Sequence, residues 1–257
     1  MPYLFGLVED PMLRRRGPMK FRCLALLLAS SLAVTVAAAQ PRKSAPAPEG
    51  CDQSRNLYGP FDYRTAQAGQ RFIVENRHFT EGVENLTKGS TGPFGGDIGY
   101  TLDVFPNHPR AIYALERLAA REKQDPPPGA TMTVECYYAR GMEFAPDDLV
   151  FRMLYVSFLI RHDRLDEAHR FLAYVVERAG DSAITNYNAG MLYFDMKDYD
   201  KALIQAHRAM ALGMSRPDLS KRLKSVNQWR DPEPPRPAGL PASAASAAAS
   251  SASQTAP

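Results

Sequence analysis

The feature that most limits how this chain can fold is a helical pattern that occurs twice in succession. Residues 186–212 contain two helical patterns joined by a short polar turn at 197–198. In both patterns apolar or small residues recur at i, i+3, i+4 and i+7, the spacing of one helix face. So short a turn allows only an antiparallel helix pair. When the sequence is aligned with itself so that Ala202 falls on Ala168, the segment DYDKA falls on RLDEA. The sequence therefore predicts a repeated helix hairpin.

The stretch Ala183–Arg216 resembles the tetratricopeptide repeat family, whose helix-turn-helix unit has the same period, about 34 residues. The positions that carry the resemblance are a small residue and an aromatic in the first helix, and an aromatic and two small residues in the second: Gly190, Tyr193, Tyr199, Ala202 and Ala209. The preceding unit, Leu149–Ser182, keeps Leu165 and Ala168 but has Val156 and Val175 at small positions. The resemblance implies an all-α, right-handed superhelical solenoid of helix hairpins that acts as a binding scaffold.

The chain divides into five parts by composition and pattern. Residues 1–39 form a leader and residues 40–50 a Pro- and Ala-rich linker. A loop-rich segment with a degenerate leading repeat follows at 51–107. The helical domain with a C-terminal capping helix covers 108–230, and 231–257 is a Pro, Ala and Ser tail that we expect to be disordered.

A secretory signal peptide is predicted at 19–39. Lys20 and Arg22 precede an apolar run, and small residues ending at Ala39 precede Gln40. We expect a periplasmic or secreted protein that begins near Gln40, with Met1 or Met19 as the start of translation. An uncleaved membrane anchor that displays the same repeats is the alternative, although the apolar run is short for a span of ~20 residues.

Charge argues against nucleic acid as a partner. Residues 1–39 hold five basic and two acidic side chains, which leaves 26 of each from the totals of 31 and 28. The mature chain is therefore neutral and lacks the basic surface that a polyphosphate backbone requires.

The leading segment and the two ends of the helical domain give less regular patterns. Residues 71–79 alternate briefly and could form a strand, 81–87 a helix started by Thr80, and 98–105 a helix capped by Asp97. A damaged repeat has helices at 109–123 and 132–144, with Tyr138 and Phe144 towards the core. Its turn is expanded to QDPPPGA. The capping helix is expected at 217–229, with Lys221, Arg222 and Lys224 on its polar face.

Two cysteines, Cys51 and Cys136, remain after the leader. An even number of cysteines in an exported chain favours a disulfide between them. Two free thiols are the alternative.

The family resemblance implies that the first helix of each hairpin lines a concave binding groove. The groove residues are then Met153, Ser157, Ile160 and Arg161 in one unit, and Tyr187, Asn188, Met191, Phe194 and Asp195 in the next. Tyr187 and Met191 stand where the family's carboxylate clamp has Lys and Asn. An aromatic and Met-lined groove suits an apolar peptide or a partner helix. Packing of these residues against neighbouring repeats is the alternative.

No catalytic motif or cofactor site emerges. An enzyme would need its site in segment 51–105, with Asp62, Glu75, His78 and Asp97 as candidates. His162, Asp166 and His169 lie around one helical turn, but a metal site also needs a fourth ligand. We therefore expect no metal and no cofactor, and a protein or peptide as the partner of a non-catalytic scaffold.

Overall fold

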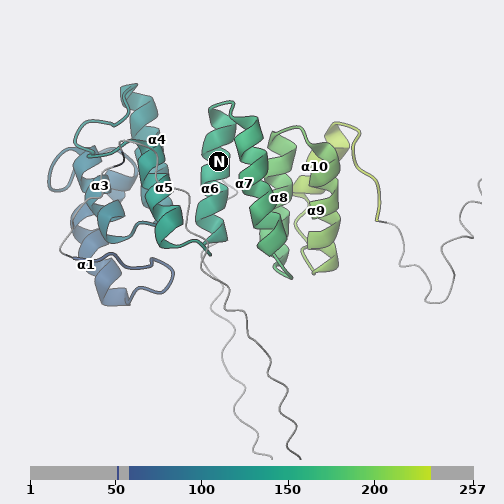
Figure 1. The fold of residues 1–257 in the computed structure, drawn as a ribbon, viewed down its shortest axis with the longest axis horizontal. Helices are drawn as coiled ribbons and strands as arrows, with labels where there is room; N and C mark the ends of the chain where they lie inside the picture. The colour runs from purple at the N-terminus through teal and green to yellow at the C-terminus, as the bar shows by residue number, and fades with distance from the viewer. Residues whose placement is uncertain (1–50, 52–57, 233–257) are drawn as a thin grey trace, which may run out of the picture. The chain divides into compact units, whose positions relative to one another are not determined.

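The structure, a computed structural model, describes residue 51 and residues 58–232. The signal peptide, the linker, Leu57 and most of the tail lie outside the described residues. The described residues form ten helices and no strand: α1 Ala68–His78, α2 Glu81–Glu84, α3 Phe94–Val104, α4 Pro109–Glu122, α5 Val134–Phe144, α6 Leu149–Arg161, α7 Leu165–Arg178, α8 Ala183–Asp195, α9 Tyr199–Ala211 and α10 Asp218–Ser225 (Figure 1). None of these helices is both long and apolar enough to cross a membrane.

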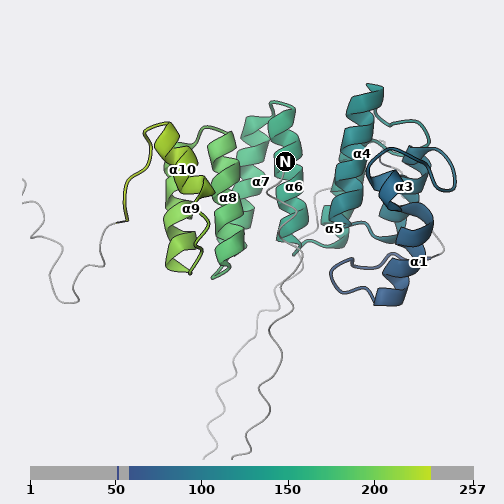
Figure 2. The ribbon, with the colours of Figure 1, turned by 180° about the vertical axis from the view of Figure 1, so that it is seen from behind.

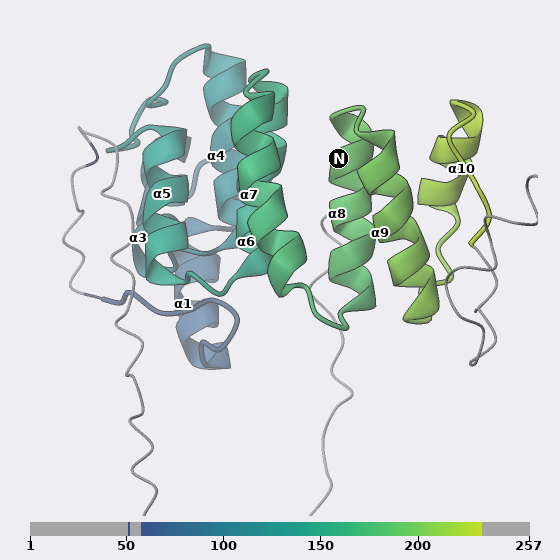
Figure 3. The same ribbon diagram turned by 45° about the vertical axis from the view of Figure 1, so that its right-hand side comes forward.

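The helices fall into two compact units, one ending at Gly180 and the other beginning at Asp181. In the first, α1 packs on α3, α4 on α5, and α6 on α7. Figure 2 shows α6 and α7 side by side from behind. In the second, α8 and α9 form a pair and α10 packs on both (Figure 3). The all-α class with neighbouring helices packed in pairs is thus confirmed.

The period that aligns Ala168 with Ala202 is visible in the backbone as well as in the sequence. The same shift carries both ends of α6 onto the ends of α8, and the start of α7 onto the start of α9. The turns also match: the amide of Arg164 donates to Leu159 O at 2.9 Å, and the amide of Asp198 donates to Tyr193 O at 3.0 Å. Asp163 and Lys197, related by this shift, both have a positive φ. The same local hydrogen bonds therefore close both hairpins.

The turns that connect successive hairpins also resemble one another. His108 and Asp148 are equivalent in these turns, and their separation in sequence is longer than the offset between the α6–α7 and α8–α9 hairpins. The amide of His108 donates to Phe105 O at 3.0 Å between α3 and α4, and the amide of Asp148 donates to Ala145 O at 3.0 Å between α5 and α6. Both residues then cap the next helix through their side chains. The expanded turn at 124–130, between α4 and α5, accounts for the longer offset.

The core of each unit is built from the inward faces of these pairs. Small residues mark the closest approaches: Ala168 and Ala202 are fully buried, and a Cβ on Gly190 would lie 2.5 Å from Leu219 Cδ2 of α10. In the first unit the largest fully buried side chains include Ile98, Leu102, Ile112, Leu115, Tyr137, Tyr138 and Phe151.

The leading segment differs from the sequence prediction in its secondary structure. Residues 71–79 are not a strand but most of α1. Its inward positions include the buried Val74 together with the polar residues Glu75 and His78, while Phe72 and Ile73 are exposed. Because these partly buried positions hold polar residues, the sequence of α1 lacks the helical period of apolar residues.

The start of α3 was also predicted wrongly. Asp97 does not cap a helix that begins at 98, because α3 already begins at Phe94. Gly95 and Gly96 are helical, and a Cβ on Gly95 would lie 2.4 Å from Pro128 O of the expanded turn. The glycines therefore lie within α3 and permit its close packing on that turn. α2 is capped by Thr80 as predicted but ends at Glu84 rather than at residue 87.

Two smaller differences concern helix ends. Phe144 lies at the exposed end of α5 and not in the core. The capping helix is shorter than 217–229, ending at Ser225, and buries Leu219 and Leu223.

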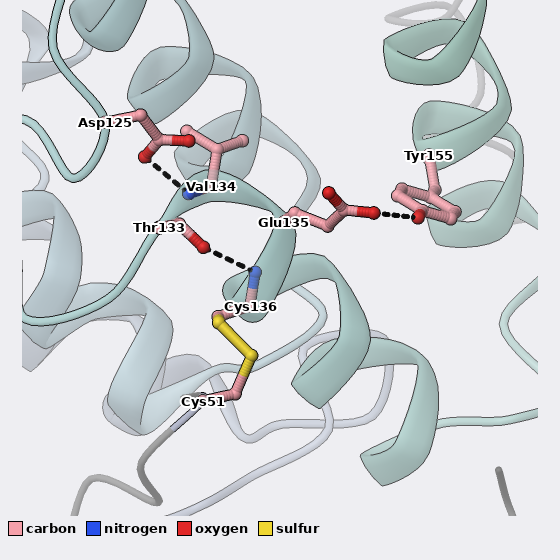
Figure 4. Close-up of a disulfide and its surroundings, with 7 residues drawn as sticks. All are labelled: Cys51, Asp125, Thr133, Val134, Glu135, Cys136 and Tyr155. Carbon is pink, nitrogen blue, oxygen red and sulfur yellow. Dashed lines mark hydrogen bonds between the residues drawn. A yellow bond between two sulfur atoms is a disulfide. The ribbon is translucent and has the colours of Figure 1, made fainter. Parts of the chain in front are cut away.

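The segment before α1 is a loop that packs on the helices. Phe61 and Tyr63 pack against Phe105, and the amide of Phe61 donates to Val104 O at 2.8 Å. A disulfide joins Cys51 to Cys136 at the start of α5, with their Cα atoms 5.3 Å apart (Figure 4). The predicted pairing is therefore present in the structure, and it ties the leading segment to the helical domain.

Candidate binding surface

The residues predicted to line the groove form the same stripe on two helices. On α6 these are Met153, Ser157, Ile160 and Arg161, and the equivalent residues on α8 are Tyr187, Met191, Phe194 and Asp195. The first two positions of each stripe are buried, the third is partly exposed and the fourth is exposed. Asn188 is also buried. The accessible part of the predicted surface is therefore the C-terminal end of each first helix.

On α8 the capping helix covers much of the stripe. Arg222 of α10 donates to Asp195 Oδ1 at 2.6 Å and lies 4.3 Å above the Phe194 ring. The Tyr187 hydroxyl donates to Asp218 Oδ2 at 3.2 Å. Arg222 was predicted on the outer polar face of the capping helix and is instead a contact between α10 and α8. Packing against a neighbouring element, the alternative to an open groove, thus describes Tyr187 and Met191.

On α6 the stripe ends in a buried polar cluster that sequence analysis missed. Glu116 of α4 accepts hydrogen bonds from the Tyr138 hydroxyl of α5 and from Arg161 Nη2. Arg161 Nη1 also donates to Ser157 Oγ at 3.0 Å. Glu116 follows Leu115 on an otherwise ordinary amphipathic helix, so only the packing of three helices shows that its carboxyl is buried.

Burial dominates the electrostatics of this cluster. The aromatic rings of Phe151, Tyr155 and Phe158 surround Tyr138 with centroids 5.2–5.5 Å away. Loss of water raises the pKa of Glu116 to about 7, although Arg161 and the Tyr138 hydroxyl act in the opposite direction. Burial and the nearby carboxylate raise the pKa of Tyr138 as well.

We expect the Glu116 carboxyl to make the fold less stable as the pH rises. The folded chain keeps this proton up to about pH 7, whereas the unfolded chain releases it near the ordinary value of 4.5. Between these values the folded state binds more protons, so the free energy of unfolding falls with rising pH. In urea unfolding at pH 5 and pH 8, the wild type should lose on the order of 3 kcal/mol more than Glu116→Gln.

The control for this experiment is Glu143→Gln, because Glu143 lies on the exposed end of the neighbouring helix α5. It should show the wild-type pH dependence. The comparison between variants is necessary because burial lowers the pKa of His108 and makes stability rise over part of the same range. Parallel pH profiles for the wild type and Glu116→Gln would contradict the assignment.

The polar residues that an enzyme site would need make local hydrogen bonds with structural partners, and only His78 and Asp97 lie directly beside one another. In a first network, Glu75 accepts from the Tyr63 hydroxyl at 2.9 Å and lies 3.3 Å from His108 Nε2. His108 Nδ1 accepts from the amide of Ala111, so Nε2 carries the proton that points at Glu75. The bond to His108 is the main reason that the pKa of Glu75 is lowered. This network holds the leading loop against the start of α4.

The second network surrounds the buried Asp97 carboxylate. It accepts from the amides of Ser90 and Thr91 and from the Thr91 hydroxyl, and His78 Nδ1 lies 3.3 Å away. These hydrogen bonds outweigh the effect of burial and lower the pKa of Asp97. Asp97 therefore fixes the loop before α3.

The remaining candidate, Asp62, is bound by Arg64, and by Asn107 Nδ2 at 2.8 Å. The bond to Arg64 is the main cause that lowers its pKa to about 2. The structure does not bring Asp62, Glu75, His78 and Asp97 into one site. Among the described residues, no three His, Cys, Asp or Glu side chains are placed to hold a metal ion, including His162, Asp166 and His169.

Comparison of the chain with family models, with curated proteins and with solved structures found no match.

Proposed function

We propose that this protein is a non-catalytic, exported scaffold of the tetratricopeptide type that binds a protein or peptide partner. The observation that carries the proposal is the single offset that relates α6 to α8, the start of α7 to the start of α9, and the hydrogen bonds of the two turns. Repeats of this kind stack short hairpins and leave one helix of each available to a partner.

The side chains at the accessible end of each first helix suit this role. Ile160 and Arg161 on α6, and Phe194 on α8 beneath Arg222, combine apolar or aromatic groups with arginine. Aromatic residues and arginine are enriched in protein interfaces and in their energetic hot spots. The proposed binding residues are therefore Ile160 and Arg161 on α6, and Phe194 and Asp195 on α8. The buried residues of each stripe hold these binding residues in position.

The test is capture of partners by the tagged full-length chain from a periplasmic extract or culture medium of the cells that make it. Ile160→Ala should weaken capture by about 30-fold, which corresponds to the ~2 kcal/mol of a hot-spot side chain. Ile204→Ala is a matched control, because Ile204 is 60% exposed on the second helix α9. It should bind like the wild type.

Loss of capture by Ile204→Ala but not by Ile160→Ala would contradict the proposed surface. Asp62→Asn and His78→Ala address the enzyme alternative in segment 51–105. If either variant stayed folded and captured its partner but lost the cellular function, the scaffold proposal would be wrong. Mass spectrometry of the purified chain would also test export, since a mature protein should begin near Gln40.

A further inference from the structure

A small hollow lies where the end of α2 meets α4. Its volume is about 210 Å³. α4 contributes positions i, i+3, i+4 and i+7 of one face, and α2 contributes its last residue and C-cap. The lining residues are Glu84, Asn85, Arg110, Tyr113, Ala114 and Arg117.

The two arginines that line this hollow differ in their ion pairing. Arg110 forms a two-pronged ion pair with Glu84, in which Nε donates to Oε1 at 2.8 Å and Nη2 donates to Oε2. Its charge is thus neutralised within the site. Arg117 makes no ion pair with an acidic side chain among the described residues, and its Nη2 donates only to the carbonyl oxygen of Glu84.

Arg117 is nevertheless fixed in place and partly buried. Its guanidinium lies 5.6 Å from the centroid of the Tyr113 ring. Its Nε is buried and has no hydrogen-bond partner, and a buried donor without a partner costs free energy. The hollow therefore holds one uncompensated positive charge on a preorganised guanidinium, beside the exposed residue Asn85.

We propose that this hollow binds a carboxylate side chain from an acidic segment of the protein partner. One net positive charge matches a singly charged carboxylate better than a phosphate dianion. The flat guanidinium also matches the two coplanar oxygens of a carboxylate. The volume admits an Asp or Glu side chain but not a folded element. The identification of the partner as a protein rests on the proposed function.

The experiment uses the full-length chain and a fluorescein-labelled peptide, Gly-Ser-Glu-Glu-Gly-Ser-amide, at low ionic strength. Its counterpart with Gln in place of Glu should bind about tenfold more weakly or worse, because hydrogen bonds to charged groups are stronger. Arg117→Gln should reduce binding of the acidic peptide to the level of the Gln peptide. Arg178→Gln is a matched control, since Arg178 also lies over a tyrosine ring, that of Tyr174, and it should bind like the wild type.

Competition and NMR complete the test. Acetate should displace the acidic peptide at lower concentration than inorganic phosphate, and the reverse order would overturn the assignment to a carboxylate. In the wild type the acidic peptide should shift the Arg117 Nε–Hε and Asn85 side-chain resonances, which needs no variant to fold. Unchanged resonances, or full binding by folded Arg117→Gln, would also overturn it. Because the probe is synthetic, such a failure leaves the capture experiment with Ile160→Ala unaffected.

Discussion

Removal of the Cys51–Cys136 disulfide is expected to lower the free energy of unfolding by about 4–5 kcal/mol. The bond joins residues 85 apart in sequence, and in the chain-entropy model a loop of that length restricts the unfolded state by this amount. Most small domains are stable by only ~5–15 kcal/mol, so the loss would be a large part of the total. Urea unfolding of the mature protein with and without a reducing agent measures it.

The double variant Cys51→Ala/Cys136→Ala is the control for this experiment. It should match the reduced wild type and should not respond to the reducing agent. Cys136 is buried, so alanine is preferred to serine because serine would add a polar group to an apolar site. A difference below ~1 kcal/mol between the oxidised and reduced proteins would show that the bond does not stabilise the fold in this way.

Replacement of Gly141 by alanine should destabilise the protein by about 1–2 kcal/mol, although alanine normally favours a helix. A Cβ at this position in α5 would lie 2.3 Å from Phe151 Cε1 and 2.4 Å from the carbonyl oxygen of Pro106. Both neighbours belong to packed elements, and one is backbone, so the helix must shift. Such overpacking costs ~1–3 kcal/mol and exceeds the ~1 kcal/mol that alanine gains over glycine in a helix.

The matched control is Gly69→Ala in α1, where no atom lies within 4 Å of the added Cβ. That variant should be unchanged or slightly more stable. Denaturant unfolding should therefore give a lower free energy of unfolding for Gly141→Ala and an unchanged or slightly higher one for Gly69→Ala. If Gly141→Ala were as stable as Gly69→Ala, the close approach of α5 to residues 106 and 151 would be wrong.

The two hairpins from α6 to α9 could be predicted from the sequence, since α6 and α8 begin where the two predicted units begin, at Leu149 and Ala183. Their apolar and small residues follow the helical period, and their ends are set by local hydrogen bonds, as where the side chains of Asp148 and Asp198 cap α6 and α9. Signals of this kind lie within a few residues of the structure that they specify. The disulfide could also be predicted, because only two cysteines follow the predicted leader.

The candidate sites depended on contacts that no local pattern shows. The Glu116 carboxyl is buried only because α4, α5 and α6 meet around it. Arg117 lacks an acidic partner only because Glu84 forms its ion pair with Arg110. Likewise the stripe on α8 predicted Tyr187 and Met191 as groove residues, but α10 packs on that face. Each of these facts involves residues at least 22 positions apart in the sequence.

The sequence by itself determined the helical class, the repeated hairpin and its turns, because periodicity and capping are local properties of the chain. Only the tertiary structure decided the secondary structure of the leading segment and the hydrogen-bond partners of each polar side chain. α1 is a helix whose inward positions include Glu75 and His78, and these are tolerated because His108, Tyr63 and Asp97 provide hydrogen bonds from other elements. A polar residue can occupy a core position only when distant residues satisfy it, and no local pattern in the sequence records that.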